Sequence, residues 1–149
     1  VGSLILTAPL VNAGYIAPGL SPGQLTIDGD VVFQEGSVLE IEIAGIGEGQ
    51  FDVLNVTGNL TMGGRLVLRF IDGFAPLQGQ TFDLLTAGTL EGSFDVTIEN
   101  LAEGFEYDLS LDPTGLTLIA LTDGVYIPEP ATAMILLTTL AGVSLSRRR

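Results

Sequence analysis

Val38-Leu39-Glu40-Ile41-Glu42-Ile43 alternates apolar and acidic residues from Leu39 onward. Successive side chains of an extended strand point to opposite faces, so the leucine and isoleucines share one face and the two glutamates share the other. Arg65–Phe70 and Phe105–Leu111 repeat this alternation. No stretch ahead of residue 131 has the period of a helix, and the body of the protein is therefore predicted to be all-β.

A turn signal separates the last two predicted strands. Asp112-Pro113-Thr114-Gly115 lies between Phe105–Leu111 and Leu116–Leu121, and this residue pattern is typical of tight turns. We expect the two strands to pair in an antiparallel fashion. Such a pair would act as a cap, because it covers unpaired backbone groups that otherwise invite aggregation at the end of a sheet.

Short internal sequence repeats, which we call echoes, indicate how the strands stack. Phe51-Asp52-Val53-Leu54 returns further along the chain as Phe82-Asp83-Leu84-Leu85, and in part as Phe94-Asp95-Val96. Leu25–Gly29 similarly matches Leu60–Gly64. Short strands that repeat between glycine and aspartate residues favour a solenoid, in which each coil shields the apolar face of its neighbour. A β-sandwich built from hairpins would use similar strands and is the alternative.

The pattern of these strands resembles the C-terminal coils of autotransporter passengers. The resemblance covers roughly residues 23–121 and rests on five segments: Gly23–Val31, Gly36–Ile43, Phe51–Gly58, Gly73–Leu85 and Gly92–Phe94. It implies a short right-handed parallel β-helix over 23–122. Residues 1–22, which the resemblance does not cover, are expected to form an irregular segment. The pattern departs from that family at its end, where a different tail stands in place of an outer-membrane barrel.

The phenylalanines and glycines of these segments have expected structural roles. Phe51, Phe74, Phe82 and Phe94 are large enough to fill the interior of a coil or to seal its end, each burying about 150–250 Å². Five glycines would permit positive φ angles or tight corners between strands: Gly36, Gly58, Gly73, Gly79 and Gly92.

Charge and residue types exclude several functions. The sequence has neither histidine nor cysteine, so Ser-His and Cys-His nucleophiles and thiolate metal sites are excluded within this chain. Residues 1–146 carry two arginines against 18 carboxylates, a net charge of −16, which should repel nucleic acid.

Two pairs of carboxylates are candidate functional groups. Glu40 and Glu42 could serve glycoside hydrolysis, and Asp28 and Asp30 could hydrolyse a glycoside or bind Ca²⁺ weakly. Both pairs are interpreted as structural, the glutamates as a solvated outer edge and the aspartates as turn residues. We therefore predict no catalytic, cofactor-binding or metal-binding residue and no cofactor.

The end of the chain has three parts. Ile127-Pro128-Glu129-Pro130 precedes sixteen uncharged, mostly apolar residues from Ala131 to Ser146, and the chain closes with Arg147, Arg148 and Arg149. A helix over 131–146 would span about 24 Å of a hydrocarbon core about 30 Å thick. The arginines should stay in the cytoplasm, so the body should face outward. We expect a linker over 123–130 and one transmembrane helix over 131–146.

This tail resembles the PEP-CTERM sorting signal of Gram-negative and related bacteria. In that family a membrane-embedded exosortase reads the tail, cleaves near the tripeptide and passes the protein to the cell surface. The resemblance makes Pro128, Glu129 and Pro130 the sorting motif and Arg147, Arg148 and Arg149 the topology signal. It implies an exosortase and the membrane as partners, and the inner membrane, then the cell surface or extracellular matrix, as locations. An ordinary membrane anchor with a chance tripeptide is the alternative.

Two classes of function remain. The first is a non-catalytic structural or adhesive protein of the bacterial surface or matrix, with exopolysaccharide or other surface proteins as partners and no binding to nucleic acid. The second is the C-terminal fragment of a carbohydrate-active β-helix enzyme whose active site lies upstream. The sequence begins at Val1 without an initiating methionine, and we expect it to be a fragment of a longer chain.

Overall fold

The protein is built from β-strands. The computed structural model describes residues 2–7, 9–18 and 22–128, and these contain fourteen strands and no helix. The strands are β1 (Gly2–Thr7), β2 (Leu10–Asn12), β3 (Tyr15–Ile16), β4 (Gly23–Asp28), β5 (Val31–Phe33), β6 (Val38–Ile43), β7 (Val53–Val56), β8 (Asn59–Met62), β9 (Arg65–Phe70), β10 (Thr81–Thr86), β11 (Thr89–Gly92), β12 (Asp95–Glu99), β13 (Tyr107–Asp112) and β14 (Gly115–Ala120). The all-β prediction is confirmed.

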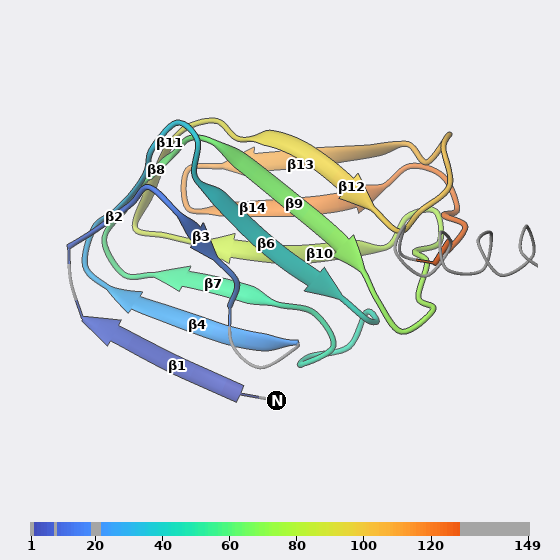
Figure 1. Ribbon diagram of the computed structural model, residues 1–149, viewed down its shortest axis with the longest axis horizontal. Helices are drawn as coiled ribbons and strands as arrows, with labels where there is room; N and C mark the ends of the chain where they lie inside the picture. The colour runs from blue at the N-terminus through green and yellow to red at the C-terminus, as the bar shows by residue number, and fades with distance from the viewer. Residues whose placement is uncertain (1, 8, 19–21, 129–149) are drawn as a thin grey trace, which may run out of the picture.

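The chain winds through three sheets in a repeated order (Figure 1). Sheet A holds β1, β4, β7 and β10, sheet B holds β2, β5, β8 and β11, and sheet C holds β3, β6, β9 and β12. Neighbouring strands within each of these sets are parallel. Three consecutive strands thus form one coil, and the coils stack one on the next. This mostly parallel arrangement is compatible with a β-solenoid, whereas a sandwich of hairpins would have antiparallel neighbours.

The first coil corrects the expectation that residues 1–22 form an irregular segment. Strands β1, β2 and β3 lie within this range and pair in parallel with β4, β5 and β6. Gly2 lies opposite Gly23, 21 positions later, whereas Leu54 lies opposite Leu85, 31 positions later. The first coil is therefore shorter than the third. β1 shows little alternation, and β2 and β3 are only three and two residues long, so pairing with the next coil gives this segment its regular structure.

Apolar columns run through the interior of the stack. Leu25, Leu54 and Leu85 lie side by side on consecutive strands of sheet A, and none is more than 4% exposed. Leu39 and Leu66 are aligned in the same way in sheet C. Full burial of one such side chain contributes about 1.5–3 kcal/mol, so the repeated columns provide most of the favourable energy of folding.

Phenylalanine rings extend this core along the corner between sheets C and A. Five rings follow one another with centroids 5.6–6.3 Å apart, in the order Phe51, Phe82, Phe74, Phe70 and Phe105. Phe94 packs edge-on against Phe33 at 5.4 Å in another part of the core. Phe82 is fully buried as expected, whereas Phe51, Phe74 and Phe94 are half-buried and pack against the core. The edge-on and stacked arrangements are those that aromatic rings prefer.

A hairpin follows the fourth coil. Strands β13 and β14 are antiparallel, with Asp112 opposite Gly115 across the turn. The Asp112 side chain accepts a hydrogen bond from the backbone N–H of Thr114 at 2.8 Å, and this bond lowers the pKa of Asp112. β14 also pairs in an antiparallel fashion with β10 of the last coil, where it buries Leu118 fully. The predicted antiparallel pairing at this turn is confirmed.

Gly63 gives a test of how closely the coils approach one another. It lies between β8 and β9, where a Cβ atom would overlap the carbonyl oxygen of Phe33 in the preceding coil. We expect Gly63→Ala to lower the free energy of unfolding by about 1–3 kcal/mol, as overpacking does. Urea denaturation followed by circular dichroism measures the change.

Gly14→Ala is the matched control, because Gly14 lies between β2 and β3 and its nearest neighbour to a Cβ is 3.9 Å away. It should change stability by less than about 0.5 kcal/mol. Equal effects of the two substitutions would contradict the close approach of coils at Gly63.

Candidate functional site

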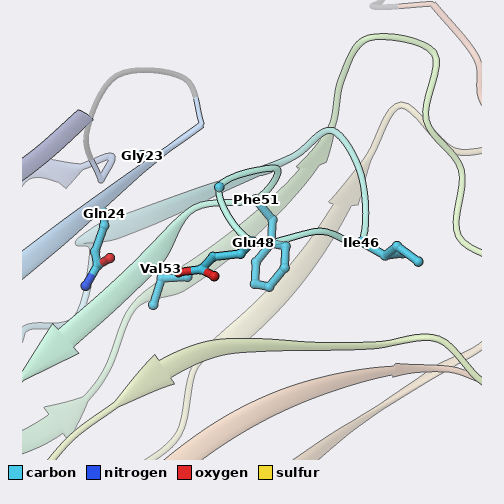
Figure 2. Close-up of a pocket in the computed structure, with 7 residues that line it drawn as sticks. Gly23, Gln24, Ile46, Glu48, Phe51 and Val53 are labelled. Carbon is cyan, nitrogen blue, oxygen red and sulfur yellow. The ribbon is translucent and has the colours of Figure 1, made fainter. Parts of the chain in front are cut away.

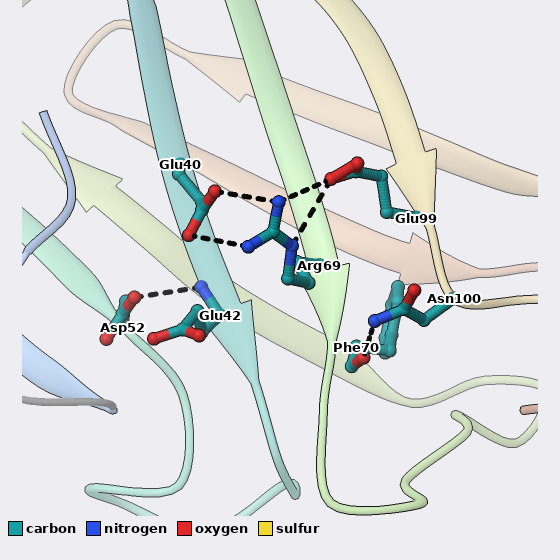
Figure 3. A network of polar contacts seen from close by, with 7 residues as sticks. All are labelled: Glu40, Glu42, Asp52, Arg69, Phe70, Glu99 and Asn100. Carbon is teal, nitrogen blue, oxygen red and sulfur yellow. Dashed lines mark hydrogen bonds and ion pairs between the residues drawn. The ribbon is translucent and has the colours of Figure 1, made fainter. Parts of the chain in front are cut away.

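The most connected polar group in the described structure lies on the outer face of sheet C (Figure 3). Arg69 of β9 forms ion pairs with Glu40 of β6 at 3.2 Å and with Glu99 of β12 at 2.9 Å. Its Nε atom also donates a hydrogen bond to Glu99 at 3.2 Å. One guanidinium therefore joins the second, third and fourth coils. These bonds, above all the one to Glu99, raise the pKa of Arg69.

Glu40 corrects the interpretation of the glutamate pair as a solvated edge. It shares the outer face with Glu42, as the alternation predicts, yet it is only 6% exposed. The Arg69 side chain of the following coil and Tyr15 of the preceding coil bond to it. The pKa of Tyr15 is raised to about 12. Partial loss of water is the main cause, and the hydrogen bond to Glu40 is the second. Glu40 is thus a bonded structural group between two coils.

Asp52 is a buried carboxylate that the sequence reasoning did not single out. It is fully buried just ahead of β7, and its two oxygens accept backbone N–H bonds from Gly23 at 2.5 Å and Glu42 at 2.8 Å. These bonds favour the charged form, but loss of water outweighs them and raises the pKa to about 6. Asp52 therefore links Gly23, at the start of the second coil, to Glu42, near the end of the same coil. The link requires a carboxylate to be buried.

The aspartates of the Asp28-Gly29-Asp30 turn bond to the next coil. Asp28 accepts a hydrogen bond from the Thr57 hydroxyl at 2.7 Å, and Asp30 accepts one from the backbone N–H of Asn59 at 2.8 Å. Within the described residues, no group of three or more acidic side chains is placed to hold a metal ion. One oxygen of each carboxylate therefore serves as an acceptor between coils.

Hydroxyl and amide side chains form further bonds between coils. Thr86 donates to Asn55 at 2.7 Å and Thr89 donates to Asn59 at 2.7 Å. Asn100, which has a positive φ of 70°, donates its side-chain amide to the carbonyl oxygen of Phe70 at 2.9 Å. The partners are 30 or 31 residues apart. The spacing of the internal echoes is the signal that could have identified them.

A pocket of about 410 Å³ lies where β4 and β7 begin (Figure 2). Phe51 and Val53 form apolar walls, and Gln24 and Glu48 contribute polar groups. The Gln50 side chain accepts a hydrogen bond from the Gly47 N–H at 2.9 Å and so shapes the adjoining loop. Glu48 is the single ionisable residue among those that line it. Glycoside hydrolysis uses two carboxylates, so these lining residues do not provide that chemistry.

The sorting motif lies at the edge of the described structure. Pro128 is exposed and follows Tyr126, which forms a bridge with Leu101. Glu129, Pro130, the predicted helix over 131–146 and the three terminal arginines lie outside the described residues. In the part of the chain that is described, no helix could span a membrane.

Comparison with known proteins gives no family assignment: no family model and no curated protein matches the sequence.

Arg69→Met tests the bond network on sheet C. It leaves Glu40 nearly buried without its cation, and we expect the free energy of unfolding to fall by about 2–3 kcal/mol, since breaking a buried ion pair strands the remaining charge. Urea denaturation at neutral pH measures the loss. Adding Glu40→Gln to this variant should restore part of it. Arg65→Met, which removes the exposed arginine of the same strand, should cost less than about 0.5 kcal/mol. Equal losses would contradict the network.

Asp52 predicts a pH dependence of stability. Its pKa of about 6 in the folded state lies above the ordinary value of 3.8, so between these values the folded state holds the proton more tightly than the unfolded state. Its contribution to stability therefore falls as pH rises from about 4 to 6, by about 3 kcal/mol in total.

The neutral Asp52→Asn variant should lack this fall. We expect its stability relative to the parent to increase by that amount between pH 4 and pH 7, measured by urea denaturation across the range. A difference between the two proteins that does not vary with pH would show that Asp52 is charged throughout.

Proposed function

We propose that the protein is a non-catalytic structural or adhesive component of the bacterial cell surface or extracellular matrix. The observation that carries this proposal is the use of its distinctive polar side chains as bonds between coils. Arg69, Asp52 and Asp28 each join strands that are distant in sequence. A fold whose polar groups are engaged in this way is suited to bear load or present a surface.

The charge of the body supports an exterior role. Its net charge of −16 over residues 1–146 keeps separate molecules apart and discourages pairing between exposed sheet edges. We also infer that the coils are right-handed, since connections between parallel strands of one sheet have that sense in about 98% of cases. A right-handed parallel β-helix is the form that the likeness to autotransporter passengers implies.

The tail supports delivery to the surface. We propose that residues 131–146 cross the inner membrane as a helix and that Arg147, Arg148 and Arg149 hold its end in the cytoplasm. An exosortase then recognises Pro128, Glu129 and Pro130, and the helix is a temporary anchor. Exopolysaccharide or other surface proteins are the partners that such a location offers.

The alternative, a fragment of a carbohydrate-active enzyme, has less support. That alternative places the active site upstream, and within this chain the pair Glu40 and Glu42 does not supply one, because Glu40 is almost fully buried and bonded to Arg69. A general acid or base needs a path to substrate, and a carboxylate held in an ion pair is a poor proton donor.

Cleavage of the tail tests the proposed delivery. The chain is expressed behind a secretion signal in a bacterium that has an exosortase, and the protein at the cell surface is analysed by mass spectrometry. We expect its C-terminus to lie near Pro128–Pro130. Recovery of surface protein with Arg149 intact would contradict processing.

Topology is tested with a variant in which Arg147, Arg148 and Arg149 are all changed to Glu. Removing the positive charges should weaken retention in the membrane and the outward orientation of the body. Protease accessibility in spheroplasts measures orientation, and replacing the same three residues with lysine is the matched control, because it keeps the charge. Unchanged retention and orientation in the glutamate variant would contradict the topology signal.

A further inference from the structure

We infer that one side of the solenoid, at the corner between sheets C and A where the described chain ends, is a membrane-contacting surface that rests on the lipid headgroup region. This inference depends on the proposed anchoring tail. The surface consists of four large apolar side chains that are 42–62% exposed: Leu77, Leu121, Val125 and Ile127. We call these four residues the exit patch.

Backbone bonds hold the segments of the exit patch together. Gly124 donates its N–H to the carbonyl oxygen of Pro76 at 2.7 Å, and Gly79 donates to Ala120 at 2.8 Å. The Gln78 N–H, next to Leu77, bonds to Asp123 at 2.8 Å. The loop between β9 and β10 therefore lies against the last described segment, and Figure 1 shows both at the end of the molecule where the chain leaves. The patch is built on a fixed framework.

The position of the patch identifies a lipid surface as its occupant. The uncharged apolar run begins at Ala131, three positions after Pro128. Three residues can span at most about 10 Å, so a membrane-inserted tail holds this side of the solenoid beside the bilayer. Tethering raises the effective concentration of lipid at the patch, and weak partition of each side chain then suffices for contact.

The charges around the patch specify the lipid. Asp123, Glu103 and Glu106 lie in the adjoining segments, and the backbone of Leu121 bonds to Glu106 at 2.9 Å. These carboxylates are repelled by anionic headgroups. The patch should therefore contact a zwitterionic surface more closely than an anionic one.

The absence of cysteine from the sequence makes a direct test simple. The full chain, with a single Leu77→Cys or Val125→Cys substitution, is labelled with an environment-sensitive fluorophore and reconstituted into phosphatidylcholine vesicles. We expect blue-shifted emission and quenching by brominated lipid. Val11→Cys and Val32→Cys are the controls, because both side chains are exposed and lie side by side on sheet B, whose strand β2 is at the opposite side of the molecule in Figure 1. Their labels should remain in water.

The outcomes separate this inference from the proposed anchor. Insertion of the tail is scored independently, as resistance of the protein to carbonate extraction. If the tail inserts but the labels at positions 77 and 125 behave like those at 11 and 32, the exit patch does not contact lipid and the inference is overturned. If the tail does not insert, the anchor fails and the inference fails with it. Vesicles that contain phosphatidylglycerol should reduce quenching at both patch positions, and stronger quenching there would contradict the charge argument.

Discussion

Alignment of apolar side chains between successive coils is the constraint on which this structure depends. A strand of sheet A cannot bury its inward face against itself, and it does so only when Leu25, Leu54 and Leu85 lie in register. A shift by one residue would turn every inward side chain to solvent. The register therefore fixes the path of the chain, and the corners between strands adapt to it in length, so that a short first coil and a longer third coil share one core.

The same register decides what the polar side chains can do. A residue on the outer face has neighbours at the equivalent position of the coils on either side. One polar partner at such a position is enough to form a bond between coils. Arg69 lies opposite Glu99 and bonds to it for this reason, and it reaches diagonally to Glu40, which lies opposite Val67. The threonine and asparagine bonds join residues that lie directly opposite each other. Bonds of this kind contribute little net energy individually, about 1 kcal/mol. They penalise slippage strongly, because a shifted coil would leave all of them unmade at once.

How much could be predicted depended on whether a feature is local. Alternation located the strands around Val38–Ile43 and Arg65–Phe70, and the echo between Phe51–Leu54 and Phe82–Leu85 has the offset of the real pairing. The echo between Leu25 and Leu60 was misleading, since Leu60 lies opposite Val31. The burial of Glu40 and Asp52 could not be predicted, because each is covered by groups from elsewhere in the chain. The local sequence pattern determines on which face of the sheet a side chain lies. Only the contacts with the neighbouring coil determine whether that side chain is shielded from water.

Ends of the stack behave differently from its middle. Inside it, every coil covers the next, and the outward apolar residue Val67 is only 8% exposed because its neighbours lie on both sides. In the first described coil the outward residues Ile5 and Val11 are 68% and 60% exposed. The hairpin of β13 and β14 relieves this at the fourth coil by adding antiparallel strands to sheet A. Repetition therefore covers the outward face of sheet C in the middle of the stack, whereas the outward apolar residues of the first described coil have no coil beyond them and are left exposed.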